Sequence, residues 1–115
     1  MSDFRLQRLG VQIQEEVGAL IVGGKVKDHR VDPFLSITRV DVSRDLSFAD
    51  VYVSSFAEEQ KLERGVLGLQ SAAGFIQAQL GSKLHIRQIP KLRFHADLSV
   101  REGFDLVKKI EDLNR

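Results

Sequence analysis

Apolar residues recur at steps of three and four positions near the start of the chain, at Leu6, Leu9, Ile13, Val17 and Leu20. This spacing predicts an amphipathic helix from Asp3 to Val22 whose apolar stripe enters a core. Gly23-Gly24 follows directly. Because glycine readily adopts the left-handed conformation, this pair is typical of a helix end.

The pattern then changes to segments rich in β-branched and aromatic residues, over residues 35–43 and 48–55. A short polar connection, residues 44–47, separates the two segments and predicts a β-hairpin. In the second segment the apolar positions alternate: Ala49, Val51 and Val53. In the first segment the apolar phase changes near Thr38-Arg39, which predicts a β-bulge.

Helical spacing returns over residues 57–80, with an apolar stripe of Leu62, Val66, Leu69 and Ala73. Small residues interrupt this stripe at positions 71–74. We predict a kinked pair of helices, because Gly74 would permit a bend and a close approach by another backbone. Gly81 is expected to close the second helix.

Alternation over residues 92–98 predicts a third strand with one apolar and one polar face. Ser99 stands three positions before Glu102, which is the pattern of a capping box at the start of a final helix. The order of helix, strand, strand, helix pair, strand and helix predicts an α+β fold. With 115 residues, the chain is expected to form a single domain over 1–115.

Composition restricts the chemistry and the cellular compartment that we expect for the protein. The chain contains no cysteine, which excludes disulfides and thiolate chemistry and is compatible with a reducing compartment. No segment is apolar for long enough to span a membrane, and the start of the chain lacks a signal-peptide pattern. We therefore expect a cytoplasmic protein with no membrane partner.

The charge is unevenly distributed, although the net charge is only +1. Between Glu63 and Asp97 there is no acidic residue. This interval contains five cations: Arg64, Lys83, Arg87, Lys91 and Arg93. Such a segment is either a solvated face or a surface that binds a polyanion, and composition alone leaves both open.

Motifs for catalysis are weak. The glycines at 18 and 23 do not form a P-loop, and the three histidines lack metal-ligand spacing. Asp28-His29-Arg30 could support acid–base chemistry, but no nucleophile accompanies it, so a polar connection is the better interpretation. We expect no enzymatic activity, no cofactor, no metal and no small-molecule substrate.

Two segments are candidates for contacts to a nucleic-acid backbone. Gly65-Val66-Leu67-Gly68 has the GxxG form with which KH domains clamp nucleic acid. It is a poor candidate, because Val66 and Leu69 belong to the apolar stripe of the surrounding helix. The helix break at Ala72-Ala73-Gly74 is the better candidate for such a turn.

Several segments together resemble the bacterial ribosome-binding factor A family, a KH-like family with an Ala-x-Gly kink in place of GxxG. The similar segments occur in the family order: residues 5–9, 26–30, 42–54, 72–76 and 84–94. The segment from Val42 to Ser54, which contains the predicted hairpin, is the most specific. His29 departs from the pattern, since the family often has proline there.

The resemblance implies a type II KH-related fold, with a three-stranded sheet packed by helices. It also implies a non-enzymatic assembly factor that binds free or immature small (30S) ribosomal subunits. Such a factor supports late maturation and processing of precursor 16S ribosomal RNA, especially in the cold, and we expect a monomer. The expected RNA contacts are Arg64, Ala72, Ala73, Gly74, Lys83, Arg87, Lys91 and Arg93. Phe75 could stack on a base, but a phenylalanine after a helix kink more often belongs to the core, so we expect it there.

Two other functions remain open at this point. A general RNA chaperone would bind unrelated single strands as well as ribosomal RNA. A KH-like protein-interaction module would use the same basic surface to dock an acidic partner. The steep salt dependence of phosphate binding distinguishes RNA binding from the second alternative.

Overall fold

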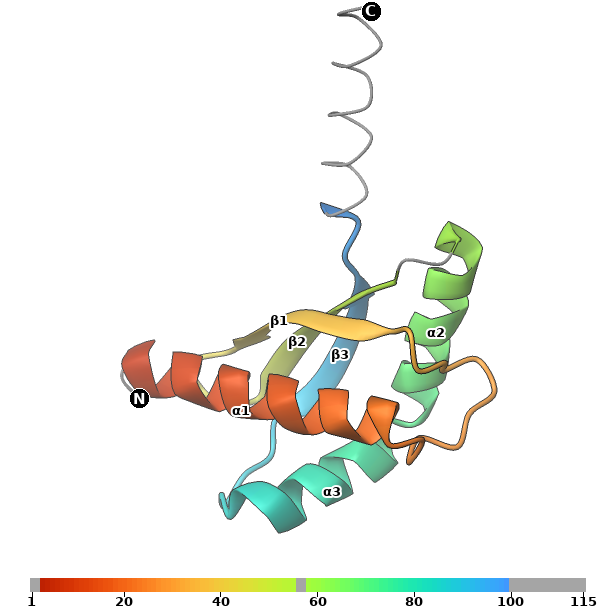
Figure 1. Cartoon of the computed structure of the whole chain (residues 1–115). Coiled ribbons are helices and arrows are strands. Elements are labelled where there is room, and N and C mark those ends of the chain that lie inside the picture. Colours follow the sequence, from red (N-terminus) through yellow and green to blue (C-terminus); the bar gives the residue numbers. More distant parts are fainter. Residues whose placement is uncertain (1–2, 56–57, 100–115) are drawn as a thin grey trace, which may run out of the picture.

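The computed structural model describes residues 3–55 and 58–99 of the chain. Figure 1 shows how the helices and strands of these residues are arranged. In chain order they are α1 (Asp3–Val22), β1 (Ser36–Val42), β2 (Phe48–Ser54), α2 (Glu59–Ser71), α3 (Ala73–Leu84) and β3 (Lys91–Ala96). The predicted α+β class is confirmed. The final helix predicted after Ser99 lies outside the described residues.

The three strands form one sheet in the order β1-β2-β3. The predicted hairpin is confirmed, because β1 and β2 pair antiparallel. The predicted bulge is also confirmed, since the register shifts between Ile37 and Arg39. β3 pairs with β2 in parallel, so α2 and α3 together form the crossover that a parallel pair requires.

The core lies between one face of the sheet and the three helices. Its largest completely buried aliphatic side chains are Ile13, Val17, Val51, Val53, Leu62, Leu69, Ile76 and Leu80. Each such side chain contributes about 1.5–3 kcal/mol by leaving water. On β3, Lys91 and Arg93 are exposed while Leu92 and Phe94 are buried, so the other face of the sheet is polar.

Helix α1 contacts the sheet through its backbone at Gly10. A Cβ atom at this position would lie 2.7 Å from the carbonyl oxygen of Val40 in β1. Real Cβ atoms do not approach a backbone oxygen so closely. A residue other than glycine would therefore push α1 away from β1.

The break between α2 and α3 is at Ala72, with φ −91° and ψ 6°. This conformation has a negative φ and does not require glycine, and it belongs to Ala72, so the expectation that Gly74 permits the bend is wrong. Gly74 lies in the first turn of α3, and a Cβ atom there would meet no other atom within 4 Å. Gly74 thus leaves the surface open beside the break.

The end of α3 also differs from the prediction. The helix continues past Gly81 to Leu84, and His85 takes the left-handed conformation, with φ 51°. Leu84 packs against the core, and this burial extends the helix by one turn. A residue with a side chain therefore occupies the position for which glycine was expected.

Candidate nucleic-acid interface

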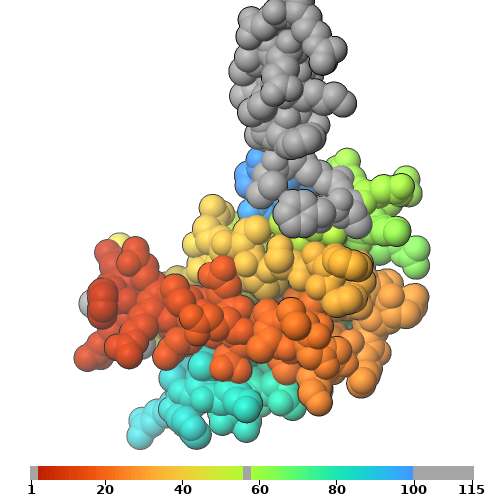
Figure 2. Space-filling model, viewed as in Figure 1, coloured from red at the N-terminus to blue at the C-terminus, as the bar shows by residue number. Residues whose placement is uncertain are grey.

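The loop that connects α1 to β1 alternates between outward and inward side chains over residues 25–30. Lys25, Lys27 and His29 are exposed, whereas Val26 is buried and Asp28 and Arg30 are partly buried. The loop forms the right-hand side of the molecule in Figures 1 and 2, where it is orange. The alternation presents cationic and imidazole groups to solvent from one short segment.

An ion pair within the loop holds its shape. Asp28 Oδ1 accepts the backbone N–H of Arg30 at 2.9 Å, and the Arg30 Nη2 atom lies 2.8 Å from Asp28 Oδ2. These hydrogen bonds from Arg30 hold the pKa of Asp28 well below its usual range. The loop is therefore fixed by an ion pair between the two neighbours of His29, the residue that departs from the proline of the family pattern.

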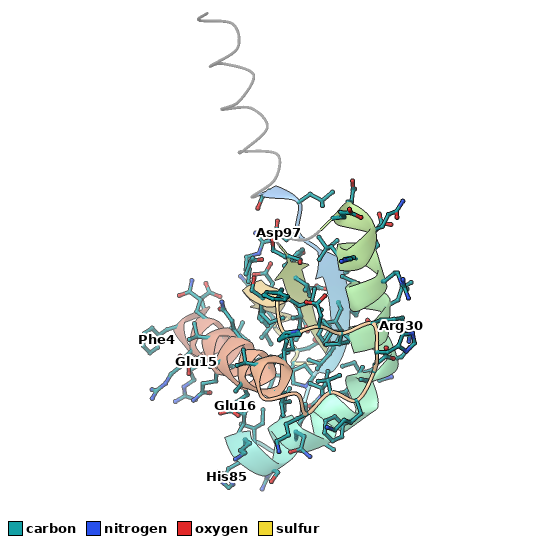
Figure 3. The ribbon with its side chains drawn as sticks, turned by 45° about the vertical axis from the view of Figure 1, so that its right-hand side comes forward. Phe4, Glu15, Glu16, Arg30, His85 and Asp97 are labelled. Atoms are coloured by element: carbon teal, nitrogen blue, oxygen red, sulfur yellow. The ribbon has the colours of Figure 1, made fainter. Side chains whose placement is uncertain are left out.

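The same arginine ties the loop to the helix break. Arg30 Nη2 donates to the Oγ atom of Ser71, the last residue of α2, at 3.1 Å. Figure 3 shows Arg30 beside α2. A Cβ atom at Gly68 would lie 2.9–3.0 Å from atoms of Val31, Arg30 and Asp28. The GxxG glycine at position 68 thus lets the loop pack against α2, and it is covered by the loop.

A pocket of about 360 Å³ lies between this loop and the helix break. Its lining residues are Lys25, Lys27, Asp28, Ser71, Ala72 and Phe75. Phe75 is 44% exposed, so the expectation that it belongs to the core is wrong. Two ammonium groups and an exposed ring suit a single-stranded nucleic acid, whose phosphates bind cations and whose bases stack on aromatic rings.

The five cations predicted from the acid-free interval are all exposed but do not gather in one place. Arg64 lines a pocket of about 190 Å³ with His29, Arg30, Asp32 and Lys61. Lys91 lines another pocket, beside Phe48 and Gln88. Lys83 and Arg87 flank His85, which lies at the far end of α3 from Arg30 in Figure 3.

Arg93 is committed to an acidic partner in β2. Its Nε and Nη2 atoms donate to the two Asp50 carboxylate oxygens at 2.9 and 3.1 Å, and its guanidinium lies 4.2 Å from the centre of the Phe48 ring. His95 Nε2 lies 2.8 Å from Asp50 Oδ1. Burial opposes ionisation of Asp50, but hydrogen bonds from His95 and Arg93 outweigh it and lower its pKa. The segment between Glu63 and Asp97, which contains no acidic residue, therefore contacts an aspartate of β2 in the folded structure.

Sequence reasoning missed Lys25 and Lys27, which lie outside the acid-free interval. The signal that could have found them is their spacing in the sequence, where two lysines alternate with an apolar valine and an aspartate directly after the predicted end of the first helix. Between residues 3 and 99, leaving out 56–57, no three His, Asp or Glu side chains gather as metal ligands would. None of the helices in these segments has the length and apolar character to cross a membrane.

Comparisons with known proteins give one consistent family. The family model described as Ribosome-binding factor A matches residues 5–110. A Treponema denticola protein named Ribosome-binding factor A is 58% identical over 113 residues, which cover 98% of this chain and 86% of that protein.

Solved structures give the same result. The crystal structure of ribosome-binding factor A from Thermus thermophilus superposes with a TM-score of 0.67 at 27% identity, covering 79% of this chain and 94% of that one. A second similar structure is a T. thermophilus ribosome binding factor A homology model fitted into a cryo-EM map of a 30S–RbfA complex. Its TM-score is 0.61 at 26% identity, over 77% of this chain and 91% of that one.

Proposed function

This chain belongs to the ribosome-binding factor A family, and from this premise we propose that it is a non-enzymatic assembly factor of the small ribosomal subunit. It binds free or immature subunits in the cytoplasm and supports late maturation of the subunit and processing of precursor 16S ribosomal RNA, most strongly in the cold. The T. thermophilus relative fitted into a 30S complex supports this choice of partner. We further propose that the chain acts as one KH-like domain and as a monomer.

The pocket at the helix break carries the proposal. Ala72 and the open surface at Gly74 allow a strand of RNA to approach the backbone of the break. Lys25 and Lys27 bind its phosphates, and Phe75 stacks on a base. In this proposal Ala72-Ala73-Gly74 takes the place of the GxxG segment of other KH domains.

The cations outside this pocket contribute to RNA binding to different degrees. Arg64, Lys83, Arg87 and Lys91 are exposed, and no ion pair is found for any of them within the described residues. They contribute phosphate contacts or long-range attraction. Arg93 contributes less, because an RNA phosphate would have to displace Asp50 from its guanidinium.

Binding energy alone accounts for the mechanism. A protein that prefers one arrangement of an RNA shifts the population by its differential affinity for that arrangement. Cooling slows rearrangements in which RNA base pairs must break, so the effect of such a protein on the folding of the subunit grows in the cold. No nucleotide hydrolysis and no strand cleavage by this chain are required.

Sedimentation of cell extract, with detection of this protein, tests the proposal. We expect co-migration with free and immature small subunits, and absence from every ribosomal fraction would contradict the proposal. Competition with unrelated single strands tests the alternative of a general chaperone, which predicts equal binding. Salt dependence tests the protein-interaction alternative, because the release of several counterions from RNA gives a steep slope.

A further inference from the structure

We propose that the pocket between His29, Lys61 and Arg64 is a second phosphate-binding site, which takes another backbone phosphate of the same RNA. The inference rests on the RNA-binding role proposed above and adds a site to it. The Asp28–Arg30 pair links the two pockets, because Asp28 lines the pocket at the helix break and Arg30 lines this one.

The geometry of α2 brings two cations to one wall of this pocket. Lys61 and Arg64 are three positions apart in the helix, and such residues are neighbours on one helix face. Both line the pocket, whose volume is about 190 Å³. His29, from the loop, also lines the pocket. Lys61 and Arg64 from α2 and His29 and Arg30 from the loop therefore place four nitrogen-bearing side chains around one small space.

The charges around the pocket favour an anion. Within residues 3–55 and 58–99, neither Lys61 nor Arg64 forms an ion pair. Glu59 and Glu63 belong to the same helix but do not line the pocket. The acidic lining residue, Asp32, accepts the backbone N–H of Phe34 at 2.8 Å through Oδ1. Two cations without an ion pair, and Arg30 already paired with Asp28, thus share the pocket with one carboxylate that is engaged within its own loop.

The loop wall of the pocket is held in place before any ligand binds. Arg30 is bonded to both carboxylate oxygens of Asp28 and to Ser71. A Cβ atom at Gly65 would lie 2.7 Å from the Leu35 side chain, so the loop and α2 are in direct contact there as well. A site that is already ordered loses less conformational entropy when it binds a ligand.

In this site the Asp28-His29-Arg30 segment helps to bind a phosphate and performs no acid–base chemistry. Asp28 and Arg30 turn inward and neutralise each other, while His29 turns outward between them. The pair positions the loop, and the histidine contacts the ligand.

The test uses the full chain labelled with ¹⁵N and titrated with single-stranded oligouridylate. We expect shifts of the backbone amides of His29, Lys61 and Arg64, as well as shifts of Ala72 and Gly74 at the helix break. The double variant Lys61→Gln with Arg64→Gln should keep the shifts at the break. Its log–log salt slope should fall by about 0.7 for each single-strand phosphate contact that is lost.

The matched control is Arg8→Gln with Arg44→Gln, which removes the same charge at the other end of the molecule. Both arginines are exposed; Arg8 belongs to the first half of α1, and Arg44 at the hairpin turn lies 3.9 Å from Asp3 at the start of α1. The start of α1 lies at the opposite side of the molecule from α2 in Figure 1. The control should leave the salt slope unchanged. An equal fall in both double variants would mean that general electrostatics and not the pocket binds the phosphate, and would overturn the inference.

Other outcomes separate the inference from the proposed function. Shifts confined to the helix break, with an unchanged slope in the Lys61→Gln, Arg64→Gln variant, would overturn the second site and leave the proposed function standing. Absence of shifts anywhere, together with no association with small subunits, would overturn both. His29→Ala gives an independent reading from the loop side, since it should weaken binding while the ¹⁵N spectrum shows that the fold is kept.

Discussion

The Oε1 atom of Gln70 in α2 accepts the backbone N–H of Phe94 in β3 at 2.9 Å. The Nε2 atom of the same side chain donates to the carbonyl oxygen of Leu92 at 3.1 Å. The amide thus makes the two bonds that a further strand would make. Because an open strand edge invites pairing with other chains, this side chain protects the outer edge of the sheet.

Gln70→Ala should destabilise the protein by about 1–2 kcal/mol, because two hydrogen bonds to backbone groups are lost. Urea unfolding measures this loss, and hydrogen exchange at the Phe94 amide should become faster. Gln60→Ala, at an exposed position of the same helix, is the matched control and should have little effect. Equal losses in the two variants would show that the edge bonds contribute nothing.

Gly74→Ala should leave the fold intact and raise its stability by about 0.5–1 kcal/mol, because alanine is the better helix former and the added Cβ meets open space. The same change should weaken RNA binding if a strand approaches the backbone there. Gly10→Ala should instead cost about 1–3 kcal/mol, since its Cβ meets the Val40 carbonyl. Thermal unfolding and binding to small subunits are the two measurements. Normal binding by Gly74→Ala would contradict the approach at the break.

Asp28→Asn should reduce the acid sensitivity of the protein. The pKa of Asp28 is lowered in the folded state by its hydrogen bonds with Arg30. Its contribution to stability is therefore present above the unfolded-state pKa, about 3.9, and is lost as the pH falls towards the lower folded value. The difference in melting temperature between wild type and variant should be largest near neutral pH and should shrink below about pH 4. A constant difference across this range would show that the ion pair does not stabilise the loop.

Charge reversal at the loop lysines should reduce association with small subunits sharply and flatten its salt dependence. Charge reversal at Arg87 and Lys91, near the start of β3, tests the face predicted from the acid-free interval and should also weaken binding to small subunits. A change of the same size at two lysines outside the described residues should do less. The three variants are Lys25→Glu with Lys27→Glu, Arg87→Glu with Lys91→Glu, and Lys108→Glu with Lys109→Glu. Equal losses in all three would mean that binding depends only on total charge.

Removal of the protein from cells should impair maturation of the small subunit most at low temperature, with accumulation of precursor 16S ribosomal RNA. The reason is that RNA rearrangements slow on cooling while a binding protein still shifts their equilibrium. Gradient profiles and primer extension at the ends of the RNA measure the effect at two temperatures. Normal maturation in the cold would contradict the assembly role, and cleavage of precursor RNA by the purified protein would reveal an active site.

Local patterns in the sequence were enough for much of the fold. The steps of three and four residues locate α1 with its observed bounds, and alternation locates the hairpin. The bulge between Ile37 and Arg39 is visible because the apolar residues change phase there. These features depend on residues close together in the chain, whose periodicity the core enforces.

The candidate site depended on contacts that periodicity does not encode. The parallel register brings Arg93 opposite Asp50, and no short-range pattern indicates that pairing. Phe75 follows a break whose angle decides whether its ring enters the core or the solvent. The loop lysines lie beside Ala72 only because the loop packs against α2 at Gly68. In each case the fold as a whole decides the surroundings of the residue.

The parallel pairing of β2 with β3 also bears on the order in which the chain folds during its own synthesis. The hairpin joins neighbouring segments, so it can form soon after residue 54 has left the ribosome. Asp50 and Arg93, in contrast, are 43 positions apart, and the contact between them must wait for both intervening helices. Pairing over long separations is slow, because the entropy of closing the loop is lost before the contacts are gained. Docking of β3, and with it completion of the sheet, is therefore expected to be a late step of folding.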